Sequence, residues 1–214
     1  MIVINKHNPQ IDDLDQLQDF ARSAYRTSKN FFGKDVQEIV ISFLYSRKEM
    51  DQVVGKITPS WLVGNTHGNL INIFSPNVFE SVSSHRRSNF MPVLTHEIAH
   101  VFTSAIYGKY NNQYPLWFRE GIAGLVAGQY QKYDLKQIRK SEFKEISSSN
   151  DWNQNPNYPQ AFLFTKYLYD QYGKEAFLEL LTKATEAKSL ADFPQIFTEV
   201  TKDSFESVSS NWLK

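Results

Sequence analysis

The pentapeptide His96-Glu97-Ile98-Ala99-His100 constrains the fold more than any other stretch of this sequence. In a helix, residues four positions apart lie about 40° from each other around the axis, so both imidazoles leave the same side. Two imidazoles placed in this way can bind one zinc ion, and Glu97, one residue further round, can reach a water on the metal without being a ligand itself. The pattern therefore predicts a helix that carries part of a catalytic metal centre.

The residues around the pentapeptide also favour a helix. Pro92 suits a first helical turn, and Leu94, Ile98, Val101 and Ala105 form an apolar stripe that is expected to face a core. One alternative stays open, because a pattern this short arises by chance in roughly one of every hundred chains of this length. The histidines would then be ordinary, partly buried polar residues of a helix.

Glu120 is the candidate for a third ligand, since a catalytic zinc takes three protein ligands and keeps one position open. It follows His100 by 20 residues, which is enough for a helix to end, a loop to turn and a second helix to return. Breaker residues predict that loop: Gly108, Asn111, Asn112 and Pro115. Small residues after Glu120 predict a helix that another backbone can approach closely: Gly121, Ala123, Gly124, Ala127 and Gly128. Alternatively, Glu120 is a surface acid near a helix start, where the helix dipole favours it.

Together the two motifs resemble those of the gluzincin metallopeptidases. The pentapeptide, followed some twenty residues later by Trp117-Phe118-x-Glu120-Gly121-x-Ala123, is similar to the compact MA-like peptidases, which share a thermolysin-type catalytic core. Residues 68–76 resemble the edge strand that those families place before the active-site helix, and residues 158–168 and 171–173 resemble a later helix. The resemblance covers residues 36–214 and implies a zincin-like fold, Zn²⁺ bound by His96, His100 and Glu120, and a peptide or protein substrate.

The chain also departs from these families. Their members often carry an acid four positions after the ligand glutamate, where it can steady a metal-bound imidazole. Gly124 occupies that position here. The Gly-x-Met-Glu-Asn run of the gluzincin aminopeptidases is absent, so we expect no recognition of a free amino terminus.

Two further residues are candidates for a role in the site. The resemblance implies that Tyr158 stabilises an oxyanion, a role that a phenol can take; the alternative is a packing tyrosine, one of 11 in the chain. His85 lies in a polar stretch, residues 81–89, that we expect to lead as a loop to the active-site helix. It is either an extra ligand or proton donor, or a surface histidine.

Composition limits the classes of protein that need to be considered. Lys plus Arg and Asp plus Glu each number 23, and Arg86-Arg87 reads as a solvated surface pair, so nucleic-acid binding is not expected. Cysteine is absent, which predicts no disulfide framework and suits either the cytosol or an exported enzyme whose leader was removed. No apolar run reaches 18 residues, so no membrane span is expected. Nothing in the sequence indicates an oligomeric state.

The remaining pattern predicts one α+β domain over residues 1–214, with an N-terminal helix in 1–35, strands in 36–90 and helices in 91–214. The expected fold is zincin-like: a small mixed sheet packed on the active-site helix, with a mostly helical C-terminal half. Helices are expected at 12–31, 47–54, 161–172 and 174–188, with Gly33, Gly55 and Gly173 as breaks. Strands are expected at 36–45, 61–63 and 70–74, with turns at 64–65 and 68–69. Residues 147–157 are expected to form a polar loop, and the apolar stripe in 193–200 is interpreted as core.

The strand at 70–74 has two interpretations. As an exposed edge beside the metal it would let an extended peptide add as another strand. As an interior strand it would be scaffold only.

The sequence thus predicts zinc-dependent hydrolysis of peptide bonds, with Glu97 as general base and Tyr158 as the oxyanion partner. Two rival hypotheses remain: a catalytically inactive zincin-like module that binds a metal or a partner, and a metal-free helical interaction domain.

Overall fold

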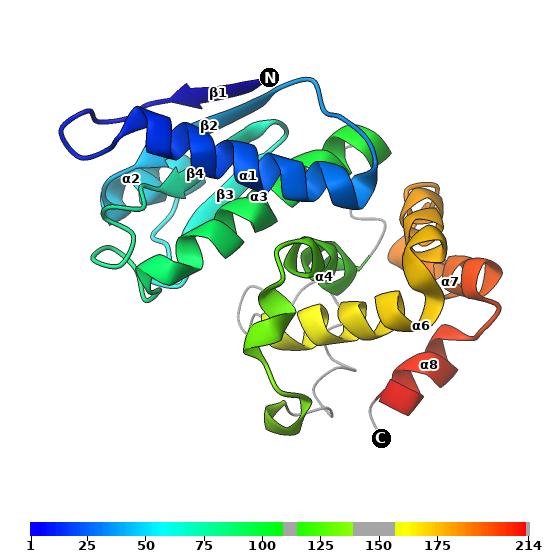
Figure 1. Cartoon of the computed structure of the whole chain (residues 1–214). Helices are drawn as coiled ribbons and strands as arrows, with labels where there is room; N and C mark the ends of the chain where they lie inside the picture. The colour runs from blue at the N-terminus through cyan, green and yellow to red at the C-terminus, as the bar shows by residue number, and fades with distance from the viewer. Residues whose placement is uncertain (109–114, 139–156, 213–214) are drawn as a thin grey trace. The chain divides into compact units, whose positions relative to one another are not determined.

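The computed structural model describes residues 1–108, 115–138 and 157–212 (Figure 1). The chain divides into two compact units, Met1–Ile106 and Tyr107–Lys214, which are described here one at a time. The first unit combines strands and helices, and the described residues of the second are helical. The α+β class is therefore confirmed. Part of the loop expected after His100 and nearly all of the polar loop at 147–157 lie outside the described residues.

The elements of the first unit are β1 (Ile2–Asn5), α1 (Leu14–Phe32), β2 (Ile39–Leu44), α2 (Arg47–Val54), β3 (Gly64–His67), β4 (Leu70–Phe74), a short 3-10 turn (Arg87–Asn89) and α3 (Phe90–Tyr107). The described residues of the second unit form α4 (Leu116–Val126), α6 (Tyr158–Ala184), α7 (Phe193–Thr201), α8 (Phe205–Trp212) and three 3-10 turns (Gln129–Lys132, Leu135–Gln137, Leu190–Asp192).

The sheet of the first unit is mixed and has the strand order β1-β2-β4-β3. Strands β1, β2 and β4 run parallel, and β3 pairs with β4 in the antiparallel sense. Ile41 lies opposite Ile71 and Phe43 opposite Ile73, and all four side chains are fully buried. Strand β4 has the predicted bounds but lies inside the sheet, so the edge interpretation of residues 70–74 was wrong and the interior alternative holds.

The end of the sheet is formed by β3, which the sequence placed three residues too early. Residues 61–63 are not a strand, and the expected turn at Gly64-Asn65 is the beginning of one. Gly-Asn-Thr-His has little intrinsic preference for a strand, so it is pairing with β4 that holds it extended. The predicted turn at Gly68-Asn69 is confirmed as a two-residue hairpin loop, in which Gly68 takes a φ of 61°.

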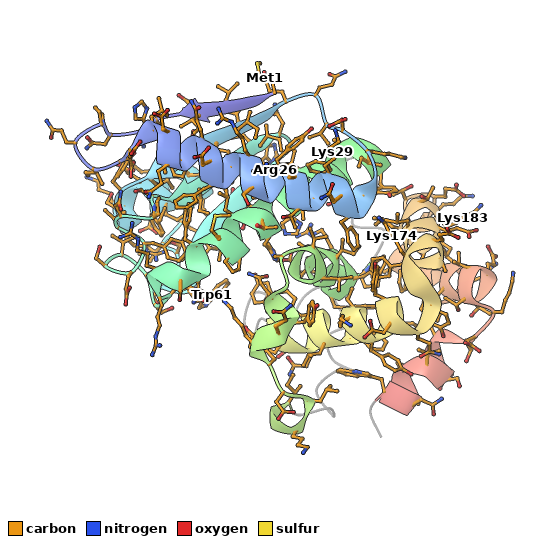
Figure 2. The ribbon with its side chains drawn as sticks, in the orientation of Figure 1. Met1, Arg26, Lys29, Trp61, Lys174 and Lys183 are labelled. Carbon is orange, nitrogen blue, oxygen red and sulfur yellow. The ribbon has the colours of Figure 1, made fainter. Side chains whose placement is uncertain are left out.

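Helix α1 begins and ends as its sequence indicates. The carboxylate of Asp13 accepts from the backbone N–H of Asp15 and Gln16, and Gly33 ends the helix in the left-handed conformation. Leu17, Ala21 and Ala24 are buried, whereas Leu14 at the start of the helix is exposed. Arg26 and Lys29 of the same helix are exposed; both are labelled in Figure 2.

The buried side of α1 packs along α3 through aromatic rings. Phe20 of α1 lies 5.5 Å from Phe90 at the start of α3, and Tyr25 and Phe32 lie 5.1 and 5.7 Å from Phe102 near its end. These distances between ring centroids are in the range of favourable aromatic pairs. Helix α1 therefore supports α3 over most of its length.

Arg47, at the start of α2, holds the chain that leads into β3. Its guanidinium lies 4.7 Å from the ring centroid of Phe74. Its N–H groups donate to one hydroxyl and four backbone carbonyls, which belong to Thr58, Pro59, Ser60, Leu62 and Val82. Partial burial lowers the pKa of Arg47, yet the guanidinium stays charged because its ordinary pKa is far above neutral. One side chain thus joins two irregular segments beside the end of the sheet.

Asp12 is the centre of a hydrogen-bond cluster at the carboxyl ends of β2 and β4. Its buried carboxylate accepts from the hydroxyls of Tyr45 and Ser75, both at 2.5 Å, and from the side-chain amide of Asn77 at 3.2 Å. The backbone N–H of Asn8 donates to the same tyrosine oxygen at 2.6 Å. Burial and the bond to Asp12 raise the pKa of Tyr45, so its hydroxyl stays protonated and remains a donor.

In the second unit, α4 packs closely against α6. A Cβ on Gly121 would overlap the Oγ1 of Thr165 and lie 2.8 Å from the carbonyl O of Ala161, and one on Gly124 would overlap the ring of Phe162. The small residues after Glu120 therefore do allow a close approach of backbones, and within this unit the helix that approaches is α6.

Aromatic side chains fill the rest of this unit. Trp117 lies at their centre, with Phe164, Phe193 and Phe205 at centroid distances of 5.1–5.9 Å. Gly173 interrupts α6 with a φ of 79° and a ψ of 172°, which confirms the predicted break. The last turn ends at Ala184, four residues before the expected end. Phe193 and Phe197 are buried, as the core interpretation of the 193–200 stripe requires.

None of the described helices combines the length and the apolar content that a membrane span requires.

Candidate metal and catalytic residues

Helix α3 carries the pentapeptide, as predicted, and is buried almost all round. Every residue from Val93 to Thr103 is buried, and the predicted stripe of Leu94, Ile98 and Val101 faces the core. Ala105 is exposed, so the stripe stops one turn earlier than expected. A helix in such surroundings is rigid, which suits a site whose side chains must be held in fixed positions.

The imidazoles of His96 and His100 face each other on one side of α3. Their Nε2 atoms are 3.0 Å apart, and their rings are nearly perpendicular, with 4.6 Å between centroids. Both residues are less than a tenth exposed. The sequence predicted this convergence from the four-residue spacing alone.

The pair meets a simple test for a shared metal. Two nitrogens bound to a tetrahedral zinc at about 2.0–2.1 Å lie roughly 3.3 Å apart. The Nε2 atoms of His96 and His100 are within a few tenths of an ångström of that separation. One N–H···N hydrogen bond between two neutral imidazoles would also fit the distance, so zinc content is the measurement that separates the two interpretations.

Glu97 lies against the end strand of the sheet. Its Oε2 accepts a hydrogen bond from the hydroxyl of Thr66 at 2.5 Å, and its side chain passes directly over Gly64. Glu97 is 8% exposed, which is unusual for an acidic residue unless its side chain has a specific partner. Sequence reasoning identified Glu97 but neither of the β3 residues that hold it.

Glu120 lies in the second turn of α4 and is buried. The Nε and one terminal nitrogen of Arg119 each lie 3.3 Å from the Oε1 of Glu120, and the side chain of Arg119 is about a third exposed. The ionised form of a carboxylate is the one that binds a metal. The alternative of a surface acid at a helix start is wrong, because the side chain is not at the surface.

The surroundings of Gly124 explain why the acid often found at this position in the resembling families is absent here. Its Cα faces the ring of Phe162 so closely that even an alanine would collide. An acid at position 124 therefore does not fit this packing. Any partner that steadies a metal-bound imidazole must come from another position.

Tyr158 is the first residue of α6 and is half-buried. Its ring lies 5.8 Å from that of Phe162, with an interplanar angle of 44°. This contact is within the second unit and concerns packing. The oxyanion role of Tyr158 stays a prediction.

His85 has a structural use in the loop before α3. Its Nε2 donates to the carbonyl O of Trp61 at 2.9 Å, and its ring packs edge-on against Phe79. Trp61 projects from the chain just before β3 (Figure 2). Because this nitrogen is bonded to a backbone carbonyl, the structure favours neither interpretation from the sequence. His85 is half-buried and links its loop to the segment around Trp61.

Comparisons with known proteins add little to this description. No protein-family model matches the chain. The chain is similar to the uncharacterized protein YhcO of Bacillus subtilis (strain 168), with 28% identity over 109 residues. The match covers 48% of this chain and 33% of the Bacillus protein, so the chain corresponds to about a third of that relative's length.

Proposed function

We propose that this protein is a zinc-dependent peptidase with a zincin-like fold of the gluzincin type. His96, His100 and Glu120 would hold the metal, and Glu97 would act as general base. The observation that carries the proposal is the arrangement on α3, where two buried imidazoles face each other at 3.0 Å and a buried carboxylate follows the first of them in the chain. The three candidate ligands are all buried, and each offers an atom of a kind that binds zinc.

A zinc ion held there would lower the pKa of its water towards about 7 and polarise the scissile carbonyl. Glu97 would accept the proton of the attacking water and deliver it to the departing amine. Arg119 would keep its contact with the Oε1 of Glu120. Tyr158 remains the candidate donor to the oxyanion.

The sheet suggests how a peptide substrate would be oriented. Strand β3 ends the sheet among the described residues, so its outer edge carries the unpaired backbone groups to which an extended peptide can add. The predicted edge role thus passes from residues 70–74 to residues 64–67. Glu97 contacts this same strand, which would bring the base close to a bound peptide.

The test begins with zinc content. Protein purified without a histidine tag should contain zinc by mass analysis, and it should cleave members of a quenched peptide library. A chelator should abolish cleavage, and added zinc should restore it. Glu97→Gln should keep zinc and lose turnover, because the amide cannot accept the proton. Absence of zinc in the wild type, or wild-type turnover in Glu97→Gln, would refute the proposal.

A second candidate is an inactive module that keeps the metal and lacks turnover. Gly124 favours this candidate, because Phe162 excludes the acid that the resembling peptidase families often carry at this position to steady an imidazole. The buried Glu97 counts against it, because a purely structural metal site has no use for a base. Bound zinc without cleavage of any library peptide would support this candidate, and a zinc-free protein would support a metal-free interaction domain.

A further inference from the structure

The face of β3 that meets α3 presents only two residues, because side chains alternate along a strand. Gly64 lies opposite Ile73 and Thr66 opposite Ile71, so these four residues share one face of the sheet. Both isoleucines are fully buried. Within this apolar surface, Thr66 supplies a hydroxyl and Gly64 supplies space, and both meet the side chain of Glu97.

Thr66 fixes one oxygen of the carboxylate. Its Oγ1 lies 2.5 Å from the Oε2 of Glu97 and 3.3 Å from the backbone carbonyl O of the same residue. A hydroxyl has one proton to donate, and the shorter distance assigns it to the carboxylate. Hydrogen bonds to an ionised acceptor are roughly twice as strong as neutral ones, so this bond holds the side chain against rotation.

Gly64 is needed for space rather than for backbone freedom. Its φ is not in the left-handed region, where glycine is otherwise favoured. A Cβ at position 64 would lie 2.5 Å from the Oε1 of Glu97 and 2.8 Å from its Cγ and its Cδ. Such distances are too short for nonbonded atoms, so any larger residue would displace the carboxylate.

We propose that Thr66 and Gly64 are positioning residues for Glu97. The strand sets the direction of the carboxylate in two independent ways, by a donor to one oxygen and by a gap that admits the other. The inference rests on the proposed function, in which Glu97 is the general base. A displacement of about 1 Å in a catalytic group can lower a rate about a hundredfold, so the direction of this side chain matters for turnover.

The kinetic test uses four variants. Thr66→Val removes the donor at nearly constant volume, Thr66→Ser restores it, and Gly64→Ala crowds the carboxylate without touching the donor. Thr95→Val is the matched control, because the hydroxyl bond of Thr95 is also part-buried but goes to the backbone carbonyl of Met91 within α3. We expect Thr66→Val and Gly64→Ala to lower kcat between about tenfold and a hundredfold, with KM and zinc content near those of the wild type. Thr66→Ser should recover most of the rate, and the control should not differ from the wild type.

A second readout does not depend on activity. Crystal structures of the zinc-free wild type, Thr66→Val and Gly64→Ala should show the Glu97 carboxylate beside β3 in the first and displaced in the other two. An unchanged Glu97 in both variants, or a wild-type kcat in both, would overturn the inference. Loss of zinc and a raised KM together with the loss of rate would also overturn it, because these would indicate general damage to the fold.

The two readouts separate the failure of the inference from the failure of the proposed function. If the wild type cleaves no peptide, the proposed function fails. The crystal structures then still decide whether β3 sets the direction of Glu97.

Discussion

Replacing Arg47 by methionine should destabilise the first unit by about 3 kcal/mol. Methionine keeps the apolar stem over Phe74 but removes every donor of the guanidinium. The carbonyls of Pro59 and Ser60 also accept backbone N–H groups, from Leu62 and Ser84. Both bonds to Arg47 are exposed, so water can replace the guanidinium there. The penalty therefore comes mainly from two other carbonyls.

Those two are the carbonyls of Leu62 and Val82, which are part-buried and accept from Arg47 at 2.6 and 2.7 Å. An acceptor left unsatisfied costs about 1–3 kcal/mol, and partial exposure places each carbonyl near the lower end of that range. Loss of the contact between the guanidinium and the Phe74 ring adds about 1 kcal/mol. The sum is about 3 kcal/mol.

Urea denaturation followed by circular dichroism measures the total, and hydrogen exchange of residues 57–63 reports the local effect. Arg47→Lys is the control: it keeps the charge and up to three donors, so it should lose roughly half as much. Exchange in 57–63 should accelerate more in the methionine variant than in the lysine variant. A loss below about 1 kcal/mol in Arg47→Met would refute the claim that this side chain holds the two segments.

Three further predictions concern the other unit, the metal and the acid range. Glu120→Ala should lose bound zinc, measured by mass analysis, whereas unchanged zinc content would show that the third ligand lies elsewhere. Gly121→Ala should destabilise the protein by about 2 kcal/mol, because the new Cβ would lie 2.8 Å from the rigid carbonyl O of Ala161; urea denaturation within about 0.5 kcal/mol of the wild type would contradict this. Hydrogen bonds from the hydroxyl and the backbone N–H of Thr58 lower the pKa of Asp51, so its contribution to stability is present above the ordinary carboxyl pKa and is lost as the pH falls through the lowered value. Asp51→Asn should therefore lose less stability than the wild type between pH values of about 7 and 3, and equal losses in the two proteins would contradict this assignment.

The sequence predicted those elements whose ends are set by local chemistry. Helix α2 has the bounds expected from its stop at Gly55, where the left-handed conformation is observed. The structure adds a cap at Ser46, whose side chain accepts from the backbone N–H of Glu49. The hairpin at Gly68-Asn69 and the break at Gly173 follow from the same property of glycine. The four-residue spacing of the histidines likewise depends only on helical geometry, and it predicted that the two rings converge.

The sequence failed where tertiary contacts decide the structure. Strand β3 was missed because its four residues are extended by pairing with β4, not by preference. Strand β1 was missed as well, because Ile2–Asn5 forms a strand through its pairing with β2. The roles of Thr66 and Arg47 could not be predicted, since each contacts residues far away in the chain. Gly64 was predicted to lie in a turn at 64–65, and only its place in a strand makes it a sign of a close approach.

The hydrogen-bond cluster at Asp12 limits how far the protein can be shortened from its N-terminal end. Trimming the chain to begin at β2 would remove β1 and α1, and it would also take away the acceptor shared by Tyr45, Ser75 and Asn77. The hydroxyls of Tyr45 and Ser75 and the amide of Asn77 would then lose this acceptor, and the loss matters most for Ser75, which is fully buried. Residues 1–12 thus stabilise the sheet, and a shortened version of the first unit has to include them.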